Sequence, residues 1–308
     1  MNQPLFRHAA NTMRSGSKSF DAAARLFDAD TRRSVLMLYT WCRYCDDAID
    51  NQIAGFAADA PASNSPVQRL TQLRTATQQV YQGHAMSEPA FAALQEVTMR
   101  HHIPARWPLE HLEGFAMDVR GERYHTLDDT LRYCYHVAGV VGLMMAHIMG
   151  VRDERVLDRA CDLGLAFQLT NIARDVIEDA EAGRCYLPGQ WLAEQGLSLG
   201  DFHAVENRAA LYRVVARLLD EAEPYYVSAL AGLPALPLRS RWAIATARDV
   251  YRAIGIKVAD AGEQAWNSRQ HTGKAEKLAL LLKGAGRAAI APLAARSPRR
   301  DSLWQRPV

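Results

Sequence analysis

Hydrophobic positions recur along most of the chain three and four residues apart, which is the spacing of one face of an α-helix. Strict alternation of hydrophobic and polar residues, which indicates a half-buried strand, is nearly absent. The pattern predicts helices over residues 4–24, 31–52, 66–82, 88–101, 108–120, 128–150, 153–180, 207–230, 238–264 and 273–294. We therefore expect an all-α fold.

Residues with turn chemistry separate these segments. The stretches "GFAADAPASNSP" (55–66) and "AGLPALPL" (231–238) predict loops, and "HTLDD" (125–129) offers helix N-caps. Neither an internal repeat nor a low-complexity linker divides the chain. We expect a single helical domain over residues 1–295, followed by a basic and flexible C-terminal tail over residues 296–308.

Composition narrows the class of protein. A formal net charge of +2 over 308 residues gives no reason to expect a nucleic-acid partner. The five cysteines are scattered and odd in number, which favours a reducing, cytoplasmic compartment. The lone C-x-x-C of Cys42 and Cys45 lacks the second ligand pair that a zinc site needs, so we expect both cysteines to pack in the core.

Contact with a membrane is a separate question. No hydrophobic run reaches the ~18 to 20 residues of a membrane span, and "VAGVVGLMMAHIMGV" (137–151) predicts a buried helix. The late basic residues have two interpretations, a solvated helix with a frayed tail or a surface that contacts lipid. They are Lys274, Lys277, Lys283, Arg287, Arg296, Arg299, Arg300 and Arg306.

Two acidic clusters stand out against the hydrophobic background. Asp46 and Asp50 lie four residues apart, as do Asp175 and Asp179, so each pair shares one helix face. Gln168 and Asn171 extend the face of the second pair by helical steps. Carboxylates that face each other in a cavity repel unless cations compensate them, and hard divalent ions such as Mg²⁺ prefer oxygen ligands. The structural alternative is two solvated helix faces.

At these residues the chain resembles a known family, the squalene and phytoene synthases, which join two prenyl diphosphates head to head. The resemblance runs over almost the whole length, and its joint pattern most resembles the bacterial phytoene synthases. It rests on "SKSF" (17–20), "YTWCRYCDDAID" (39–50), "YCYHVAGVVGLMM" (133–145) and "LGLAFQLTNIARDVIEDAEAGRCYLP" (163–188).

The resemblance implies a fold and a reaction. The fold is the isoprenoid-synthase helical bundle around a central cavity. The reaction condenses two molecules of geranylgeranyl diphosphate through prephytoene diphosphate to phytoene and releases two diphosphates. That reaction is the first committed step of carotenoid biosynthesis. The resemblance implies Mg²⁺ or Mn²⁺ as cofactor and no NADPH. Squalene or dehydrosqualene synthesis from farnesyl diphosphate is the alternative, and a non-catalytic subunit is a remote one.

The resemblance also implies roles for particular residues. It implies catalytic roles for Asp46, Asp50, Asp175, Asp179, Tyr39 and Tyr133. It implies substrate contacts for Ser17, Phe20, Arg43, Gln168, Asn171, Arg174 and Tyr251. Asn171 joins the four aspartates as a metal ligand. For each tyrosine, core packing is the alternative role. Because substrate and product are lipids, we expect a cytoplasmic protein, with peripheral contact at the inner face of the membrane as an alternative.

Small residues recur in one predicted helix. Ala138, Gly139, Gly142 and Ala146 lie near one face of the segment 128–150. They leave room either for a long substrate or for the close approach of another helix. The sequence alone does not choose between the two.

Overall fold

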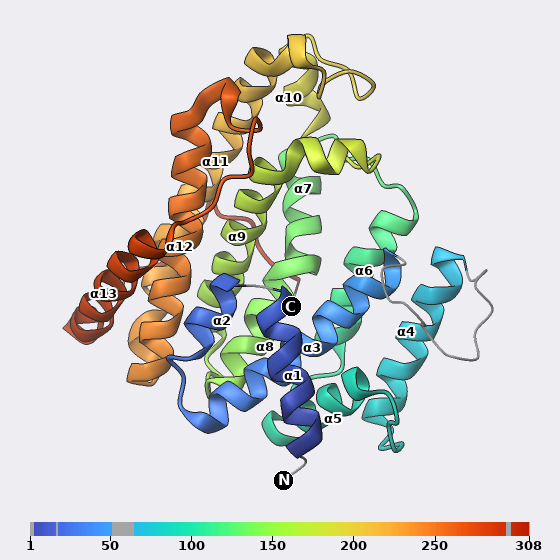
Figure 1. Ribbon diagram of the computed structural model, residues 1–308, viewed down its shortest axis with the longest axis vertical. Helices are drawn as coiled ribbons and strands as arrows, with labels where there is room; N and C mark the ends of the chain where they lie inside the picture. Colours follow the sequence, from blue (N-terminus) through green and yellow to red (C-terminus); the bar gives the residue numbers. More distant parts are fainter. Residues whose placement is uncertain (1–2, 17, 51–64, 294–296, 308) are drawn as a thin grey trace.

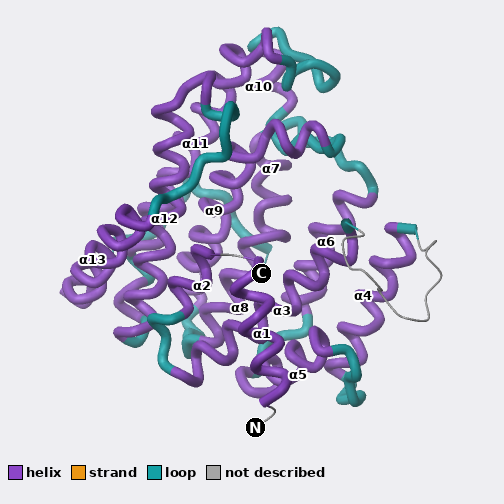
Figure 2. The backbone as a smooth tube through the Cα atoms, in the orientation of Figure 1, coloured by secondary structure: helices purple, strands orange, loops and turns teal. Residues whose placement is uncertain are grey.

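The computed structural model describes residues 3–16, 18–50, 65–293 and 297–307. Within these ranges the chain forms helices and no strand, so the expected all-α fold is confirmed (Figures 1 and 2). The α-helices are α1 (Gln3–Gly16), α2 (Lys18–Ala24), α3 (Ala29–Ile49), α4 (Pro66–Tyr81), α5 (Pro89–His101), α6 (Arg106–Val119), α7 (Leu127–Cys134), α8 (Val140–Ile148), α9 (Glu154–Glu181), α10 (Gly189–Glu194), α11 (Arg208–Leu230), α12 (Leu238–Ala261) and α13 (Lys274–Ile290).

The structure differs from the predicted helices in three places. The segment 4–24 is two helices, α1 and α2, and the segment 128–150 contains a π-helical turn (Tyr135–Gly139) between α7 and α8. The short helix α10 was not predicted. Most of the predicted loop at 55–66 lies outside the described residues. The predicted N-cap before α7 is confirmed, since the Thr126 side chain accepts a hydrogen bond from the backbone N–H of Asp129.

The longest helix, α9, lies in the middle of the bundle and packs against α8, α11 and α12 (Figure 1). Leu165 and Leu169 of α9 are buried in the core. Leu36 and Trp41 of α3 are buried as well. Burial on several sides explains why both helices read as hydrophobic in sequence. Among the described residues no helix combines the length and hydrophobicity needed to cross a bilayer.

Two glycines let α9 approach the helix before it closely. A Cβ atom added to Gly142 would lie 2.3 Å from the carbonyl oxygen of Ala160, and one added to Gly164 would lie 2.4 Å from that of Ala138. Both glycines also line the central cavity. The small residues of segment 128–150 therefore serve both purposes left open by the sequence, close packing and room inside the cavity.

Replacing Gly164 by alanine is expected to lower the free energy of unfolding by about 2 kcal/mol, because the new methyl group pushes two backbones apart. Urea unfolding followed by circular dichroism measures the change. Gly286→Ala in α13 is the matched control, since its Cβ meets nothing within 4 Å. It should raise stability by about 0.5–1 kcal/mol. Equal stability of the Gly164 variant and the wild type would contradict the close approach.

The C-terminal tail packs against the bundle over residues 297–307, the segment for which the sequence led us to expect a flexible end. Arg299 donates to both carboxylate oxygens of the buried Asp162, at 3.0 and 2.7 Å. Arg306 donates to Asp158 at 2.7 Å, and Leu303 is buried. Residues 296 and 308 lie outside the described ranges. Basic side chains that looked solvated in sequence thus form ion pairs with α9.

Candidate active site

A cavity of about 940 Å³ lies inside the bundle. Its walls come from α1, α2, α3, α6 to α9 and α11 to α13, and from the segment 269–272. Most of the wall is apolar. The polar side chains gather near the C-terminal halves of α3 and α9, where both acidic motifs lie. The cavity can hold a long hydrophobic molecule with a charged head at that polar end.

Most of the predicted site residues line this cavity. They are Phe20, Tyr39, Arg43, Asp46, Tyr133, Gln168, Asn171, Arg174 and Tyr251. Three predicted aspartates, Asp50, Asp175 and Asp179, are not part of the cavity wall. Asp50 and Asp175 nevertheless form ion pairs with arginines that line the cavity. Ser17, which was also predicted, lies outside the described residues.

Arginines hold the aspartates of both motifs. Arg184 donates to Asp50 at 2.6 Å, although the two residues are 134 positions apart. Asp175 accepts hydrogen bonds from Arg174 at 2.7 Å and from Arg269 at 3.2 Å. On α3, Arg43 donates to Asp46 at 3.0 Å. Among the described residues, no three carboxylate, imidazole or thiol side chains lie close enough together to hold a metal ion.

Burial makes several carboxyl groups of this region easier to protonate. Desolvation, followed by repulsion from Asp175, raises the pKa of Asp179 to about 7. Desolvation also raises the pKa of Asp46, against the opposing effect of Arg43. A cation placed among these groups would favour their charged forms.

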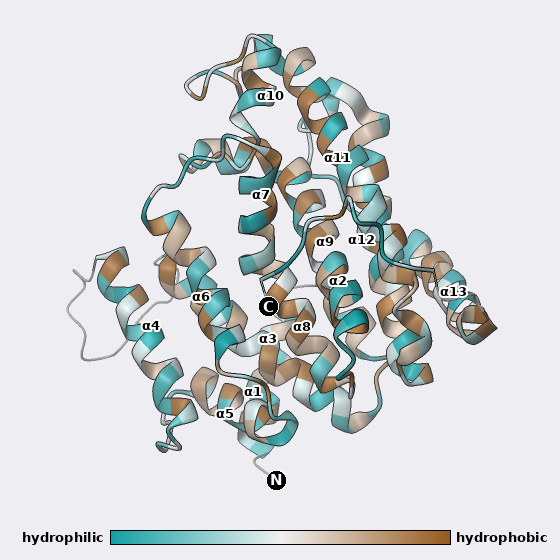
Figure 3. Ribbon diagram, turned by 180° about the vertical axis from the view of Figure 1, so that it is seen from behind, coloured by the Kyte–Doolittle hydropathy of each residue, from teal (hydrophilic) through white to brown (hydrophobic). Residues whose placement is uncertain are grey.

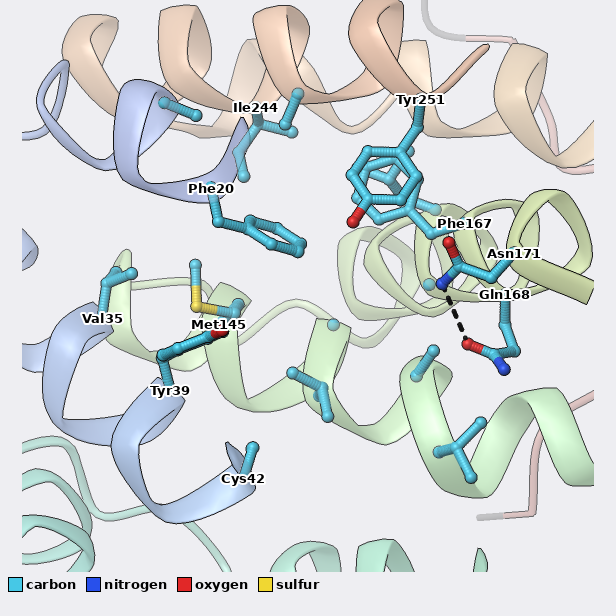
Figure 4. A pocket seen from close by; sticks show the side chains of 18 of the residues that line it. Phe20, Val35, Tyr39, Cys42, Met145, Phe167, Gln168, Asn171, Ile244 and Tyr251 are labelled. Carbon is cyan, nitrogen blue, oxygen red and sulfur yellow. Dashed lines mark hydrogen bonds between the residues drawn. The ribbon is translucent and has the colours of Figure 1, made fainter. Parts of the chain in front are cut away.

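The side chain of Asn171 offers a further oxygen ligand. Its amide nitrogen donates to Gln168 at 3.3 Å, the dashed line in Figure 4. Its amide oxygen is buried and accepts no hydrogen bond within the described part of the chain. A buried oxygen without a partner is costly unless a ligand compensates it. Carboxylate oxygens and this amide oxygen are of the ligand type that Mg²⁺ or Mn²⁺ prefers, and waters or phosphate oxygens would have to supply the rest of the coordination.

Aromatic rings form part of the apolar wall. Phe167 and Tyr251 stack with ring centroids 4.2 Å apart, and Phe20 lies 5.6 Å from the Tyr251 ring. Figure 4 shows the Phe20 and Tyr251 side chains turned toward the same space, and Tyr39 lies beside Phe20, with ring centroids 6.4 Å apart. Ring faces attract cations, so this wall can stabilise a positively charged hydrocarbon.

Asp118 is a site residue that sequence analysis missed. It lines the cavity from the end of α6 and accepts hydrogen bonds from Tyr133 at 3.2 Å and from Tyr186 at 3.0 Å. The two phenol rings stack with centroids 4.4 Å apart. Desolvation raises the pKa of Asp118 to about 6. This carboxylate fixes the direction of the Tyr133 hydroxyl.

Replacing Asp118 by asparagine is expected to lower kcat about tenfold to a hundredfold, because a hydrogen bond to a charged group contributes about 1.5–3 kcal/mol. We expect KM to change little, since Asp118 is placed as a partner of the tyrosines. Steady-state kinetics with geranylgeranyl diphosphate, the substrate that the resemblance implies, measures both constants. Tyr186→Phe is the control, because it removes one of the two hydrogen bonds and keeps the ring. An Asp118→Asn enzyme with wild-type kcat would contradict this positioning role.

Arg184 and Arg269 were also missed as site residues, although the first lies inside a quoted motif. Arg184 follows the acidic helix by three residues, and a cation beside an acidic motif is a usable signal. Arg269 lies in a loop 94 residues from its partner Asp175, and its local sequence, "NSRQH", carries no sign of that pairing.

Comparisons with known proteins agree with this geometry. The squalene/phytoene synthase family profile matches residues 13–276. A 15-cis-phytoene synthase of Pantoea ananas is 63% identical over 309 aligned residues that cover 100% of both chains. A 15-cis-phytoene synthase of Paracoccus sp. is 51% identical over 293 residues, covering 95% of this chain and 94% of the relative.

The fold agrees as well. A crystal structure of a dehydrosqualene synthase in complex with a ligand matches with a TM-score of 0.80 at 27% identity, covering 92% of this chain and 96% of that one. The expected isoprenoid-synthase bundle and the expected resemblance to bacterial phytoene synthases are thereby confirmed. The chain belongs to the squalene/phytoene synthase family of prenyltransferases.

Proposed function

We propose that this chain is a phytoene synthase. It condenses two molecules of geranylgeranyl diphosphate through prephytoene diphosphate to phytoene and releases two diphosphates, as the first committed step of carotenoid biosynthesis. The observation that carries the proposal is the cavity, which joins a long apolar and aromatic chamber to an arginine- and aspartate-rich end. The full-length relatives at 63% and 51% identity support the same reaction.

We infer that Asp46, Asp50, Asn171, Asp175 and Asp179 hold Mg²⁺, with Mn²⁺ as the alternative, together with oxygens of the substrate diphosphate. The unpartnered Asn171 oxygen supports this assignment, since Asp46 lines the same cavity and Asp175 follows Asn171 by one turn of α9. When bound, Mg²⁺ supplies positive charge that stabilises the departing diphosphate.

The arginines at the polar end act on the same diphosphate. Arg43 and Arg174 line the cavity, and each is paired with a carboxylate of its own helix. A guanidinium group can donate two parallel hydrogen bonds to phosphate oxygens, so these side chains orient the head of the substrate. The attraction grows as the carbon–oxygen bond breaks and negative charge collects on the leaving group.

The apolar end receives the prenyl chains and protects the cation. Water would capture an allylic cation, and the hydrophobic wall keeps water away from it. The rings of Phe20, Phe167 and Tyr251 present π-faces to positive charge. Tyr133, oriented by Asp118, and Tyr39 place hydroxyl groups inside the cavity as hydrogen-bond partners for a diphosphate or for a proton lost in each half-reaction.

The location follows from the chemistry of the molecules involved. Both substrates carry long hydrocarbon chains, and the product has no charged head. We place the enzyme in the cytoplasm, with peripheral contact at the inner face of the membrane. The tail contributes little to that contact, since Arg299 and Arg306 form ion pairs with α9. We therefore expect the protein to float with liposomes after residues 296–308 are removed.

Incubating the purified protein with geranylgeranyl diphosphate and Mg²⁺, without NADPH, is expected to give phytoene in the extracted hydrocarbon. Removing the metal with EDTA should abolish the product, and added Mg²⁺ should restore it, because the aspartates alone give the diphosphate no positive charge. A thirty-carbon product from farnesyl diphosphate only would move the enzyme to the squalene or dehydrosqualene branch, to which the matching solved structure belongs. No hydrocarbon from either substrate would indicate a non-catalytic subunit.

A further inference from the structure

Helix α13 presents a hydrophobic face to solvent. Leu282 is 64% exposed and Ile290 is 63% exposed, and Leu293 just beyond the helix is 86% exposed. Leu278 is also exposed, one turn before Leu282. The other exposed positions of the helix are alanine or glycine, except for Lys274 and Lys283. A surface helix normally turns its polar residues outward, so this arrangement is the reverse of the usual one.

Contacts with α12 fix which side of α13 faces outward. The indole N–H of Trp242 donates to the carbonyl oxygen of Leu281 at 2.9 Å, and Arg241 donates to that of Ala288 at 3.0 Å. A Cβ atom on Gly284 would lie 2.4 Å from the Thr246 hydroxyl oxygen, so the two helices touch closely there. Figures 1 and 3 show α13 at the edge of the molecule, outside α12, with hydrophobic residues on it.

The polar residues of α13 face inward or sideways. Arg287 donates to the buried Asp249 at 2.9 Å, and Glu276 pairs with Lys257 at 2.6 Å. Arg287 and Glu276 form ion pairs within the protein, so the outward face of α13 consists mainly of leucine, isoleucine and alanine. Lys274 and Lys283 lie half a turn apart around the helix, on opposite borders of that face.

The charge on the borders points to one kind of partner. All charged residues at exposed positions of α13 are lysines, so the rim of the face is positive. Lysines bordering a hydrophobic stripe match an anionic lipid surface, where hydrocarbon meets the stripe and phosphate meets the ammonium groups. A second copy of the chain is a poorer match, because a two-fold contact would bring the same positive rims together.

The helix also lies beside the active-site cavity. A smaller apolar pocket of about 230 Å³ lies between α2, α12 and α13 and includes Leu278 and Leu281 in its wall. This pocket shares Phe20, Tyr251 and Lys277 with the wall of the main cavity. The α13 face is therefore close to the chamber in which a hydrocarbon would form.

We propose that the outward face of α13 docks on an anionic lipid bilayer and brings the apolar side of the cavity next to the hydrocarbon layer. The reason for docking rests on the proposed function, because an uncharged forty-carbon product needs a lipid phase on release. The helix lies in the interface and does not cross the bilayer.

Sedimentation with vesicles of equal parts phosphatidylglycerol and phosphatidylcholine tests the proposal on the full chain. The variant L282S/I290S/L293S is expected to bind these vesicles about tenfold less tightly or worse, because it removes three side chains from the lipid contact. None of the three lines either cavity. The matched control V67S/M99S/V205S removes three exposed hydrophobic side chains elsewhere and should bind like the wild type.

Charge is tested separately. Replacing Lys274 and Lys283 by glutamine should weaken binding to the anionic vesicles about fivefold per lysine. Vesicles of phosphatidylcholine alone should bind the wild type less tightly than the anionic ones. Wild-type binding by the triple serine variant, or equal loss in the control, would overturn the proposal. A third outcome would also overturn the proposal. The wild type would be a dimer in solution, and the triple serine variant would be a monomer that still binds vesicles, which would make α13 a contact between copies.

Activity in detergent separates this inference from the proposed function. The triple serine variant should make phytoene at the wild-type rate from substrate dissolved in detergent micelles, while losing vesicle binding. If the protein forms phytoene and the triple serine variant binds vesicles like the wild type, the docking surface is wrong and the proposed function stands. Vesicle binding through α13 without any hydrocarbon product would overturn the proposed function and leave the docking surface in place.

Discussion

Replacing Asp175 by asparagine is expected to lower turnover about a thousandfold while the protein stays folded. Asp175 is the point at which Arg174 and Arg269 meet, and both arginines line the cavity. The amide keeps the size of the side chain but removes the charge that would bind a cation beside the substrate diphosphate. Removing one group that stabilises a developing charge lowers kcat on the order of a hundredfold to a thousandfold. We expect the upper end of that range, because Asp175 would bind the metal and also positions two arginines.

Steady-state rates with geranylgeranyl diphosphate and Mg²⁺ measure the effect, and circular dichroism checks the helical content. Asp46→Asn is expected to behave in the same way on the opposite helix. Asp220→Asn, an exposed aspartate on α11, is the matched control and should keep wild-type rates. If Asp46→Asn and Asp175→Asn both turned over like the wild type, the carboxylates would have no part in diphosphate ionisation, and the metal assignment would be wrong.

The acidic faces could be predicted from sequence because a helix converts spacing into direction. Steps of three and four residues place Gln168, Asn171 and Asp175 on one side of α9, and the structure puts the first two in the cavity wall. The helices themselves could be predicted for the same reason. Hydrophobic residues at helical spacing mark a buried face wherever that face points.

The partners of the aspartates could not be predicted in this way. Periodicity says which side of a helix is charged, but it does not say which distant residue meets it. Arg184 reaches Asp50 from 134 positions away, and Arg269 reaches Asp175 across 94 positions. The expectation of bare carboxylates facing each other therefore left out the arginines that hold them in this structure.

Asp118 shows the same limit in a smaller setting. A single aspartate near the end of a helix is common on protein surfaces, and nothing in "AMDVRG" distinguishes it. Its role follows from α7 and the segment after α9, which bring Tyr133 and Tyr186 together over it. Only the packing of elements distant in sequence makes this carboxylate part of the site.

The contacts of the tail with α9 could not be predicted for a related reason. A stretch with three arginines and two prolines after position 296 resembles a solvated end, because the chain near it offers few carboxylates. Its partners, Asp158 and Asp162, lie on α9, one turn apart and facing the tail. The sequence predicts that α9 is buried, and buried aspartates need cationic partners. Asp158 and Asp162 are therefore the signal from which an arginine-rich covering segment could have been inferred.

Replacing Arg299 by methionine is expected to lower the free energy of unfolding by about 3 kcal/mol. Asp162 is fully buried, and its carboxylate accepts two hydrogen bonds from Arg299 and another from Ser228. Methionine fills similar space but leaves the carboxylate without its main counter-ion. Removing one member of a buried ion pair costs about 3–5 kcal/mol, because the remaining charge stays out of water. Arg159, which lies nearby, compensates part of that cost.

Urea unfolding measures the loss, and the neighbouring Arg300→Met is the matched control. Arg300 is exposed, so its replacement should change stability by no more than about 0.5 kcal/mol. Two adjacent arginines of the same tail thus have opposite expectations, which separates anchoring at Asp162 from a general effect of tail charge. Equal stabilities of the two variants would show that the tail does not anchor to α9 in solution, and the flexible tail expected from sequence would then be correct.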